Sequence, residues 1–332
     1  MVSVYDFRSY IGFLEDKGQL VRIRREVDPV YELSAVLWRL DEHGKAAVFE
    51  KIKGRSMPVV GGLYQTMDRI GVALGFAEGK QFGSSELLRL IHSAILKPTA
   101  YEPVKQGAVK DVVEEGTGVD LTKLPVPTFF EGDAGPYITA GVGITRNPET
   151  GVINMGVYRT QVIDRNKITV YGSPISDLHG IYRRAEEKGY ESLDMAVAIG
   201  VDLPVLVAAI SKTPTNISEL EVAGSINGKP IKVVKCETVD LMVPANAEIV
   251  LEGKVDLKNK IPEGPFGEFT GCYGSSLNPV TNIKAVCHRE DPLYHVIPPG
   301  RAREHFTLGS IVATAMNQII LKVLKSRFEN IK

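Results

Sequence analysis

The feature that most constrains the fold of this chain is a change of pattern near residue 108. Before that point, segments with apolar residues at helical spacing alternate with strand-like segments. This alternation predicts a small α/β domain over residues 1–107. Ser3 and Asp6 resemble a capping box at the first helix, and Gly18 is expected to end it. The expected helices are 4–14, 31–44, 66–76 and 84–96, and the expected strands are 19–27, 46–54 and 57–64.

After residue 108, short β-like runs are punctuated by proline and glycine. This pattern predicts a mostly antiparallel sheet or barrel over residues 108–300, so the whole chain is expected to be of the α+β class. Two helices are expected to interrupt it, one at about 178–189 and one starting near residue 216. Residues 301–332 are expected to form a linker helix, because 304–326 are amphipathic at helical spacing.

The composition excludes several classes of protein. The 39 Lys and Arg are balanced by 40 Asp and Glu, which gives no basic field for nucleic acid. Three cysteines without a C-x-x-C pair predict neither a disulfide framework nor a structural zinc site. The charged N-terminus is not a signal peptide, and no apolar stretch approaches a membrane span. A cytoplasmic location is the simplest expectation. The six histidines are dispersed, and each is expected to be a surface residue or a satisfied core residue.

The segment IPEGPFGEFTGC, residues 261–272, carries the clearest chemical signal. Glu263 and Glu268 lie five positions apart, and two glycines and a proline are among the four residues between them. A rigid turn with this composition can direct both carboxylates into one cleft. The neighbouring phenylalanines would make that cleft apolar, and an apolar cleft favours the protonated form that a general acid needs. The alternative is a surface loop with two solvated acids.

Two further segments contain side chains that could bind ligands. Asn154 offers an amide oxygen suited to a hard cation, and Arg159 offers a planar fork for a carboxylate or phosphate. In an extended strand these two residues point to opposite faces, so a bend or bulge is needed for both to serve one site. In SELEVAG (218–224), Glu219 or Glu221 could bind a metal, although acids at a helix start more often interact with its dipole.

Together these motifs are specific. The order N-M-G-x-Y-R, S-E-x-x-x-A-G, V-V-K-C-E-T-V-D-L-M-V-P-A-N-A-E-I-V-L-E-G and E-G-P-F-G-E-x-T-G resembles the UbiD decarboxylase family. The resemblance runs from about residue 5 to 325. It implies an N-terminal α/β domain, a split β-barrel like that of flavin reductases, a linking helix and a C-terminal oligomerisation domain. Members usually continue well beyond 332 residues, so the oligomerisation domain is expected to be missing from this chain.

The resemblance also implies a cofactor and a set of site residues. The cofactor is prenylated FMN, supplied by a partner flavin prenyltransferase, with its phosphate held through Mn²⁺ and K⁺. Arg159, Glu263 and Glu268 match the catalytic trio, with Glu268 as proton donor. Asn154 and Glu219 match metal ligands, and His179 is the histidine available as the third, although an ungapped match falls nearer Asp177. The residues that match backbone contacts with the flavin are Val157, Tyr158, Arg159, Gly172 and Ser173.

The activity that the resemblance implies is reversible non-oxidative decarboxylation of an α,β-unsaturated or aromatic carboxylic acid, through an adduct with the prenylated FMN. A full-length homo-oligomer without a nucleic-acid partner is expected. The compact N-terminus resembles archaeal members that act on a phosphorylated anhydromevalonate. Two alternatives remain open: an FMN-binding oxidoreductase on the same barrel, and an inactive fragment that acts as a binding or assembly protein.

Overall fold

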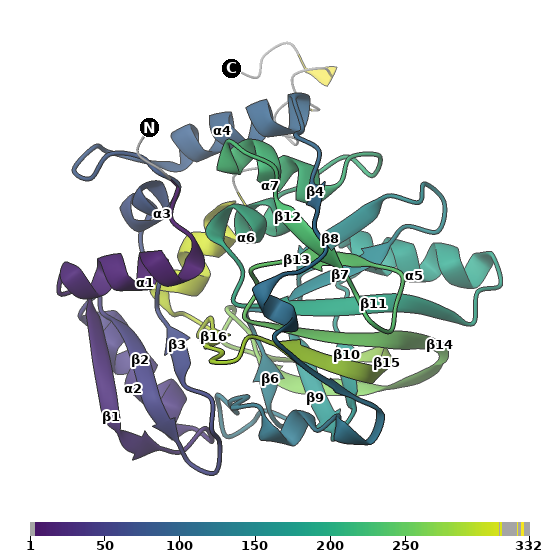
Figure 1. Ribbon diagram of the computed structural model, residues 1–332, viewed down its shortest axis with the longest axis horizontal. Helices are drawn as coiled ribbons and strands as arrows, with labels where there is room; N and C mark the ends of the chain where they lie inside the picture. The colour runs from purple at the N-terminus through teal and green to yellow at the C-terminus, as the bar shows by residue number, and fades with distance from the viewer. Residues whose placement is uncertain (1–3, 312, 314–323, 325–326, 329–332) are drawn as a thin grey trace.

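The computed structural model describes residues 4–311, 313, 324 and 327–328. Within these residues the strands form three sheets, and Figure 1 shows the smaller N-terminal sheet at the lower left and the large curled sheet on the right. The chain is thus of the expected mixed α+β class. The flavin-reductase-like split barrel stays a prediction, and so does the division into domains at residues 107 and 300.

The N-terminal sheet has the strand order β1-β2-β3-β16. Its last strand comes from the far end of the chain and pairs in parallel with β3. The predicted alternation of helices and strands is confirmed, but the expected capping box is wrong, because Asp6 is the N-cap and its side chain accepts a hydrogen bond from the N–H of Ser9. The elements are α1 (Phe7–Asp16), β1 (Leu20–Val27), α2 (Glu32–Glu42), β2 (Ala46–Ile52), β3 (Val59–Gly61), α3 (Met67–Ala73), α4 (Ser84–Leu96) and β16 (Tyr294–Val296).

The curled sheet is antiparallel at every pairing between its described strands. Its order is β6-β9-β10-β15-β14-β11-β7-β8, with β5 paired to β15. The longest hairpin, β14–β15, has three register shifts, and such bulges let a strand bend and coil. The strands are β5 (Val112–Glu115), β6 (Tyr137–Ile138), β7 (Val142–Arg146), β8 (Ile153–Val157), β9 (Thr160–Asp164), β10 (Lys167–Val170), β11 (Ser192–Ile199), β14 (Ile249–Gly267) and β15 (Tyr273–His288).

Helices α5 (Asp177–Glu187), α6 (Leu203–Ile210) and α7 (Glu219–Asn227) connect the strands of this sheet. The first and third were expected from the sequence, but α6 was not. Its first seven residues are all buried, so it has no polar face and no helical periodicity that distinguishes it from a buried strand. A third sheet joins β13 (Met242–Pro244), β12 (Lys232–Lys235) and β4 (Glu102–Pro103), and single 3₁₀ turns lie at Ala108–Lys110, Gly116–Gly118 and Leu121–Lys123.

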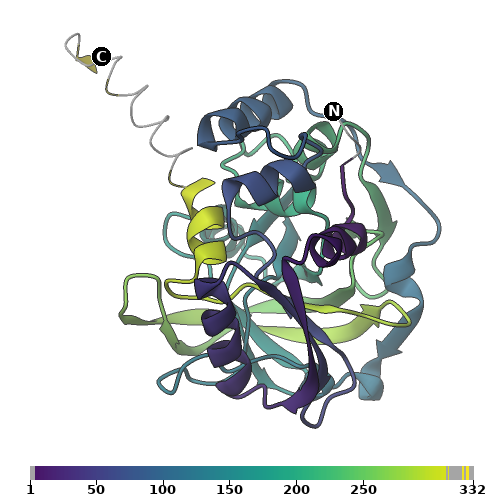
Figure 2. The same cartoon turned by 90° about the vertical axis from the view of Figure 1, so that its left-hand side faces the viewer.

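After β16 the chain forms a helix over residues 303–311. Figure 2 shows this yellow helix directly above the purple α2, and the backbone N–H of Arg303 donates to Asp41 of α2 at 3.0 Å. Most of the predicted linker helix beyond this point lies outside the described residues. No helix in the described part of the chain is long and apolar enough to cross a membrane.

Candidate active site

A kink in β14 directs the first glutamate of the 261–272 segment inward. The register with β15 shifts between Glu263 and Phe266, and Glu263 is completely buried. Gly264 has φ +94°, and a Cβ there would lie 2.5 Å from the carbonyl oxygen of Gly274, so only glycine fits. The rigid turn expected between Glu263 and Glu268 is therefore corrected: residues up to Gly267 belong to β14, and a bulge within the strand supplies the bend.

The second glutamate follows the end of β14, in the tight connection to β15. The N–H of Glu268 donates to the carbonyl of Cys272 at 2.9 Å, and its carbonyl accepts from the N–H of Gly271 at 3.0 Å. Just before it, the N–H of Gly267 donates to Asp133 at 2.9 Å. These bonds fix the backbone on both sides of Glu268, while its side chain keeps 30% of its surface exposed.

Arg159 joins the two glutamates. It lies between β8 and β9, and its Nε and Nη2 donate to the two oxygens of Glu263 at 3.0 and 2.7 Å. Its Nη1 donates to Glu268. The guanidinium carbon also lies 4.0 Å from the centre of the Tyr171 ring. The structure therefore brings Arg159 to two glutamates that lie more than 100 positions further along the chain, and its guanidinium bridges a buried and a partly exposed carboxylate.

A cavity of about 210 Å³ lies beside Arg159. Its walls come from separate parts of the fold and are mostly apolar: Val157, Leu206, Ile210, Phe266, Ile297 and Leu308. Two polar side chains share it. The hydroxyl of Thr139 is buried without a hydrogen-bond partner in the described structure, and the ring of His305 is held by Gly300. A flat, largely apolar molecule with a few polar atoms fits such a lining.

The residues expected to touch the flavin do not all lie on this cavity. Val157 lines it, and Tyr158 packs its ring over Gly156 and Gly143, where a larger residue would collide with that ring. Gly172 is buried and packs against the start of α5, and the carbonyl of Ser173 accepts the hydroxyl of Ser176 at 2.7 Å. Gly172 and Ser173 are not part of the described cavity wall.

A second, much smaller cavity lies on the same strand, β8. Its volume is about 10 Å³, room for about one water molecule or ion, and its lining includes Asn154, Asp177 and Glu219. The Oδ1 of Asn154 is buried without a hydrogen-bond partner in the described structure, and its Nδ2 lies 3.5 Å from Glu219. An orphaned amide oxygen beside a buried carboxylate is a donor set that fits a hard cation.

Glu219 is anchored by the backbone of β8, because the N–H of Met155 donates to its carboxylate at 2.8 Å. Burial raises the pKa of Glu219 to about 8 when no cation is present. Asp177 accepts both of its bonds from Lys212, at 2.9 Å each. Glu219 therefore forms hydrogen bonds with a backbone N–H and an amide, and Asp177 is paired with a lysine, while Arg184 also lines the cavity.

His179, the third metal ligand expected from the resemblance, is not brought to this cavity. It is exposed on the first turn of α5, where its backbone N–H donates to Ser176 at 3.2 Å. No group of three or more His, Cys, Asp or Glu side chains in the described ranges is arranged to hold a metal ion. The geometry brings Asn154 and Glu219 together, with Asp177 the nearer of the two candidates for the third position.

Sequence reasoning missed His305. The sequence predicts each histidine to be a surface residue or a satisfied core residue, and the resemblance gives a role to His179 alone. The signal was present in the spacing, because His305, Leu308 and Gly309 stand at i, i+3 and i+4 of one helix and all three line the cavity beside Arg159.

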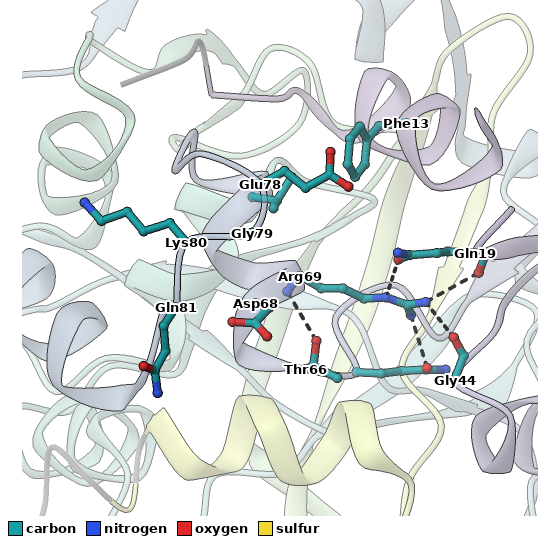
Figure 3. Close-up of a pocket in the computed structure, with 12 residues that line it drawn as sticks. Phe13, Gln19, Gly44, Thr66, Asp68, Arg69, Glu78, Gly79, Lys80 and Gln81 are labelled. Carbon is teal, nitrogen blue, oxygen red and sulfur yellow. Dashed lines mark hydrogen bonds between the residues drawn. The ribbon is translucent and has the colours of Figure 1, made fainter. Parts of the chain in front are cut away.

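A larger cavity, of about 570 Å³, lies in the N-terminal part of the chain and contains no comparable cluster. Figure 3 shows Arg69 on its wall, with a guanidinium that donates to the side chain and the carbonyl of Gln19, to Gln65 and to the carbonyl of Gly44. It also donates to the carbonyl of Gly62 at 3.2 Å. Every donor of Arg69 is thus committed to a neutral oxygen within the protein. A guanidinium in this state holds segments together and has no donor left for a ligand.

Two family models match the chain. Residues 102–302 match the 3-octaprenyl-4-hydroxybenzoate carboxy-lyase Rift-related domain, and residues 11–86 match the N-terminal domain of the same carboxy-lyases. The first match alone covers more than half of the chain and contains every candidate site residue except His305.

Known proteins and solved structures are similar to this chain over most of its length. An uncharacterised protein from Archaeoglobus fulgidus is 39% identical over 96% of this chain and 68% of its own length. The structure of an evolved dimeric form of the UbiD-class enzyme HmfF from Pelotomaculum thermopropionicum, in complex with prFMN, is 38% identical with a TM-score of 0.88; the match covers 96% of this chain and 73% of that one. The closed form of vanillic acid decarboxylase from Sedimentibacter hydroxybenzoicus is 29% identical with a TM-score of 0.85, over 92% of this chain and 67% of that one.

Proposed function

Because this chain belongs to the UbiD family of carboxy-lyases, we propose that it removes CO₂ from an α,β-unsaturated or aromatic carboxylic acid with prenylated FMN as cofactor. The observation that carries the proposal is the cluster of Glu263 and Glu268 around Arg159, whose guanidinium lines a largely apolar cavity. A guanidinium beside such a cavity can orient a carboxylate, and a carboxyl group can deliver a proton.

The cofactor assignment is supported by the cavity and by the relatives. Solved UbiD-class structures contain prFMN or FMN, and the apolar walls beside Arg159 suit a flat ring system. Val157, Tyr158, Arg159, Gly172 and Ser173 are the proposed contacts. When bound, the prenylated flavin supplies an electron sink for the carbon that loses CO₂. A partner flavin prenyltransferase would supply it, and full-length relatives of this chain would form homo-oligomers.

The cation assignment is supported by the orphaned oxygen of Asn154 beside Glu219. We assign these two residues as ligands of Mn²⁺, with the third position open between Asp177 and His179. Strand β8 and the turn after it carry both Asn154 and Arg159, so a cation at the small cavity would tie the cofactor to the strand that holds the guanidinium. A K⁺ site is part of the same proposal.

The roles of the side chains follow from their surroundings. Glu263 is fully buried and holds two of the three bonding nitrogens of Arg159, so it fixes the plane of the guanidinium. Glu268 is partly exposed and can exchange a proton with water between turnovers. Glu268 would therefore deliver a proton to the carbon that has lost CO₂, while the aliphatic walls exclude water from that carbon.

The Glu268→Gln variant tests this assignment. Gln keeps the size of the side chain but carries no transferable proton, so decarboxylation should fall by about 10²–10⁴-fold. The flavin absorbance of the purified holoenzyme should remain. The measurement is CO₂ release by mass spectrometry over a panel of unsaturated and aromatic acids. A Glu268→Gln enzyme with full activity would remove the proton-donor role.

The Asn154→Ala variant tests the cation site separately. Loss of the amide oxygen should lower the Mn²⁺ content and the flavin content together, measured by metal analysis and absorbance after co-expression with the prenyltransferase. Retention of both at wild-type levels would place the cation elsewhere.

An FMN-dependent oxidoreductase on the same fold is the alternative, and it gives no role to the paired glutamates. Bleaching of the holoenzyme flavin by NADH would favour it. Absence of any flavin after co-expression would instead favour a binding or assembly protein.

A further inference from the structure

Two residues at the start of β9 hold Glu263 at two places. The guanidinium of Arg159 donates to the carboxylate of Glu263 at 3.0 and 2.7 Å. The Oε1 of Gln161 accepts the N–H of Gly264, the next residue in the chain, at 3.1 Å. The chain is extended here, because the carbonyl of Arg159 accepts the N–H of Tyr171 and continues the pairing of β9 with β10. Residues two positions apart in an extended chain lie on one face, so one face of one strand holds both the side chain and the backbone at Glu263.

The bond from Gly264 to Gln161 joins two strands that are not neighbours in the sheet. Strands β10 and β15 lie between β9 and β14, so backbone pairing does not connect them. The loop before β6 contacts the same part of β14: the N–H of Ala134 donates to the carbonyl of Pro265 at 2.7 Å, and the N–H of Gly267 donates to Asp133 at 2.9 Å. Groups outside the β14–β15 hairpin therefore help to fix the bend in β14.

The bulge in β14 explains why an acceptor is needed at this point. The register with β15 shifts between Glu263 and Phe266, which leaves Gly264 outside the paired positions. Glu263 is completely buried and Gln161 is 7% exposed, so water has little access to this peptide. A buried N–H group needs a hydrogen-bond partner. The amide of Gln161 supplies the acceptor that the strand pairing does not.

This acceptor carries no charge, and neither does its neighbour in the sheet. Tyr137 of β6 lies directly opposite Gln161, is completely buried and packs on Phe266 with 4.3 Å between ring centres. Burial and the charge of Glu263 raise the pKa of Tyr137, so its hydroxyl stays protonated. The charged groups that act on this part of the described structure, besides Glu263, are Arg159, Glu268 and Asp133. A carboxylate in place of the Gln161 amide would add a like charge beside Glu263 and compete for the guanidinium.

We propose that Gln161 is a positioning residue that acts through Glu263. The inference rests on the proposed decarboxylase function and adds a residue to the same site. Arg159 holds the carboxylate of Glu263 and Gln161 holds the peptide that follows it, so together they set the orientation of the guanidinium that Glu268 shares. Gln161 is not part of the described cavity wall, so it should affect turnover and not substrate binding. A small displacement of a catalytic group lowers the rate steeply.

The first test is the Gln161→Met variant, which keeps the length of the side chain and removes the acceptor. The kcat for CO₂ release by the holoenzyme should fall at least about tenfold, and KM should stay within about threefold. Backbone hydrogen exchange over residues 261–268, measured by mass spectrometry with and without flavin, should become faster. Wild-type turnover or wild-type exchange in this variant would overturn the proposal.

Thr169→Val is the matched control. Thr169 of β10 lies directly opposite Gln161 on its other side, is completely buried, and has a hydroxyl without a hydrogen-bond partner in the described structure. Valine keeps the shape and removes no hydrogen bond, so kcat and the exchange over residues 261–268 should stay within about twofold of wild type. A loss as large as that of Gln161→Met would show that any polar change in this row disturbs the sheet, and the specific role of Gln161 would be wrong.

The Gln161→Glu variant gives a pH dependence that a purely structural role would not. A protonated carboxyl group has the shape of the amide and still accepts the N–H of Gly264. Burial and the nearby Glu263 raise the pKa of the new group, so the stability that it contributes is present at low pH and is lost as pH rises through the raised pKa. The kcat relative to wild type should fall at least about tenfold between about pH 5.5 and pH 8, and the midpoint of urea unfolding should fall with it. A ratio that stays constant over this range would contradict the proposal.

The proposed function and the role of Gln161 fail in different ways. If the wild type releases CO₂ and Gln161→Met releases it equally fast, the decarboxylase function stands and the role of Gln161 is wrong. If the wild type releases CO₂ from no acid, but exchange over residues 261–268 still depends on Gln161 and the unfolding of Gln161→Glu still depends on pH, the reaction is wrong. Gln161 is then retained as the residue that holds Glu263 in place.

Discussion

Two buried arginines, Arg69 and Arg159, show how the same side chain serves two different purposes in one molecule. Arg69 is 9% exposed as a whole residue, and the side chain of Arg159 is 9% exposed. Arg69 donates to neutral oxygens of Gln19, Gln65 and Gly44 (Figure 3), and also to the carbonyl of Gly62. Arg159 donates hydrogen bonds to two carboxylates, those of Glu263 and Glu268, and it lines a cavity. The difference indicates that partner charge and access, and not burial, separate a structural arginine from a functional one.

The surroundings of Arg69 and those of Arg159 are nevertheless connected through one residue, Gly62. The carbonyl of Gly62 accepts a hydrogen bond from Arg69 at 3.2 Å, and its N–H donates to Glu304 at 2.9 Å. Glu304 is the neighbour of His305, which lines the cavity of Arg159. The hydrogen bonds around Arg69 therefore help to hold the helix that forms one wall of the candidate active site. Variants of these residues should show whether a change lowers the free energy of unfolding, the rate of decarboxylation or both.

The largest effect is expected from Arg159→Met. This change removes the fork and leaves the fully buried Glu263 without its partner. Decarboxylation by the holoenzyme should fall by at least about 10³-fold, and the free energy of unfolding should drop by about 3–5 kcal/mol. Turnover and urea unfolding measure the two effects. An Arg159→Met enzyme with wild-type activity would show that Arg159, like Arg69, has only a structural role.

An intermediate effect is expected at Glu304, the link between the two regions, and it depends on pH. Burial raises the pKa of Glu304 to about 7, so the folded chain holds this proton more tightly than the unfolded chain does. The resulting stability is fully present below about pH 4.5 and is lost as pH rises towards 7.

Glu304→Gln removes this titration. The stability advantage of the wild type over the variant should shrink by roughly 3 kcal/mol between pH 4.5 and pH 7.5, measured by urea unfolding at each pH. An advantage that grows with pH would show instead that the two N–H donors of Gly62 and Tyr64 hold Glu304 ionised in the folded state.

The smallest effect is expected from Arg69→Met. The change leaves several oxygens without donors, but the adjacent cavity admits water to replace them. The free energy of unfolding should fall by about 2 kcal/mol. The kcat of the holoenzyme at a temperature well below unfolding should stay within about twofold of wild type. A loss of turnover comparable with that of Arg159→Met would show that the N-terminal region takes part in the reaction.

The sequence predicted the local elements of the N-terminal region because their signals are local: helical spacing, glycine stops and short alternating strands. It failed where burial removes the pattern, as in α6, and where a strand tolerates glycine and proline at a bulge, as in β14. The meeting of Arg159 with Glu263 could not be derived from spacing, because it depends on the strand order β9-β10-β15-β14. Only the resemblance to a family connected them.

The parallel pairing of β16 with β3 has a consequence for how the chain is made. Residues 294–296 leave the ribosome long after residues 59–61, so the edge of β3 stays open until almost the whole described chain has been synthesised. An open edge is a template for pairing with other chains. A fragment that stops before residue 294 should therefore aggregate more readily than the intact chain, even though it contains every helix and strand assigned to the N-terminal region except this one.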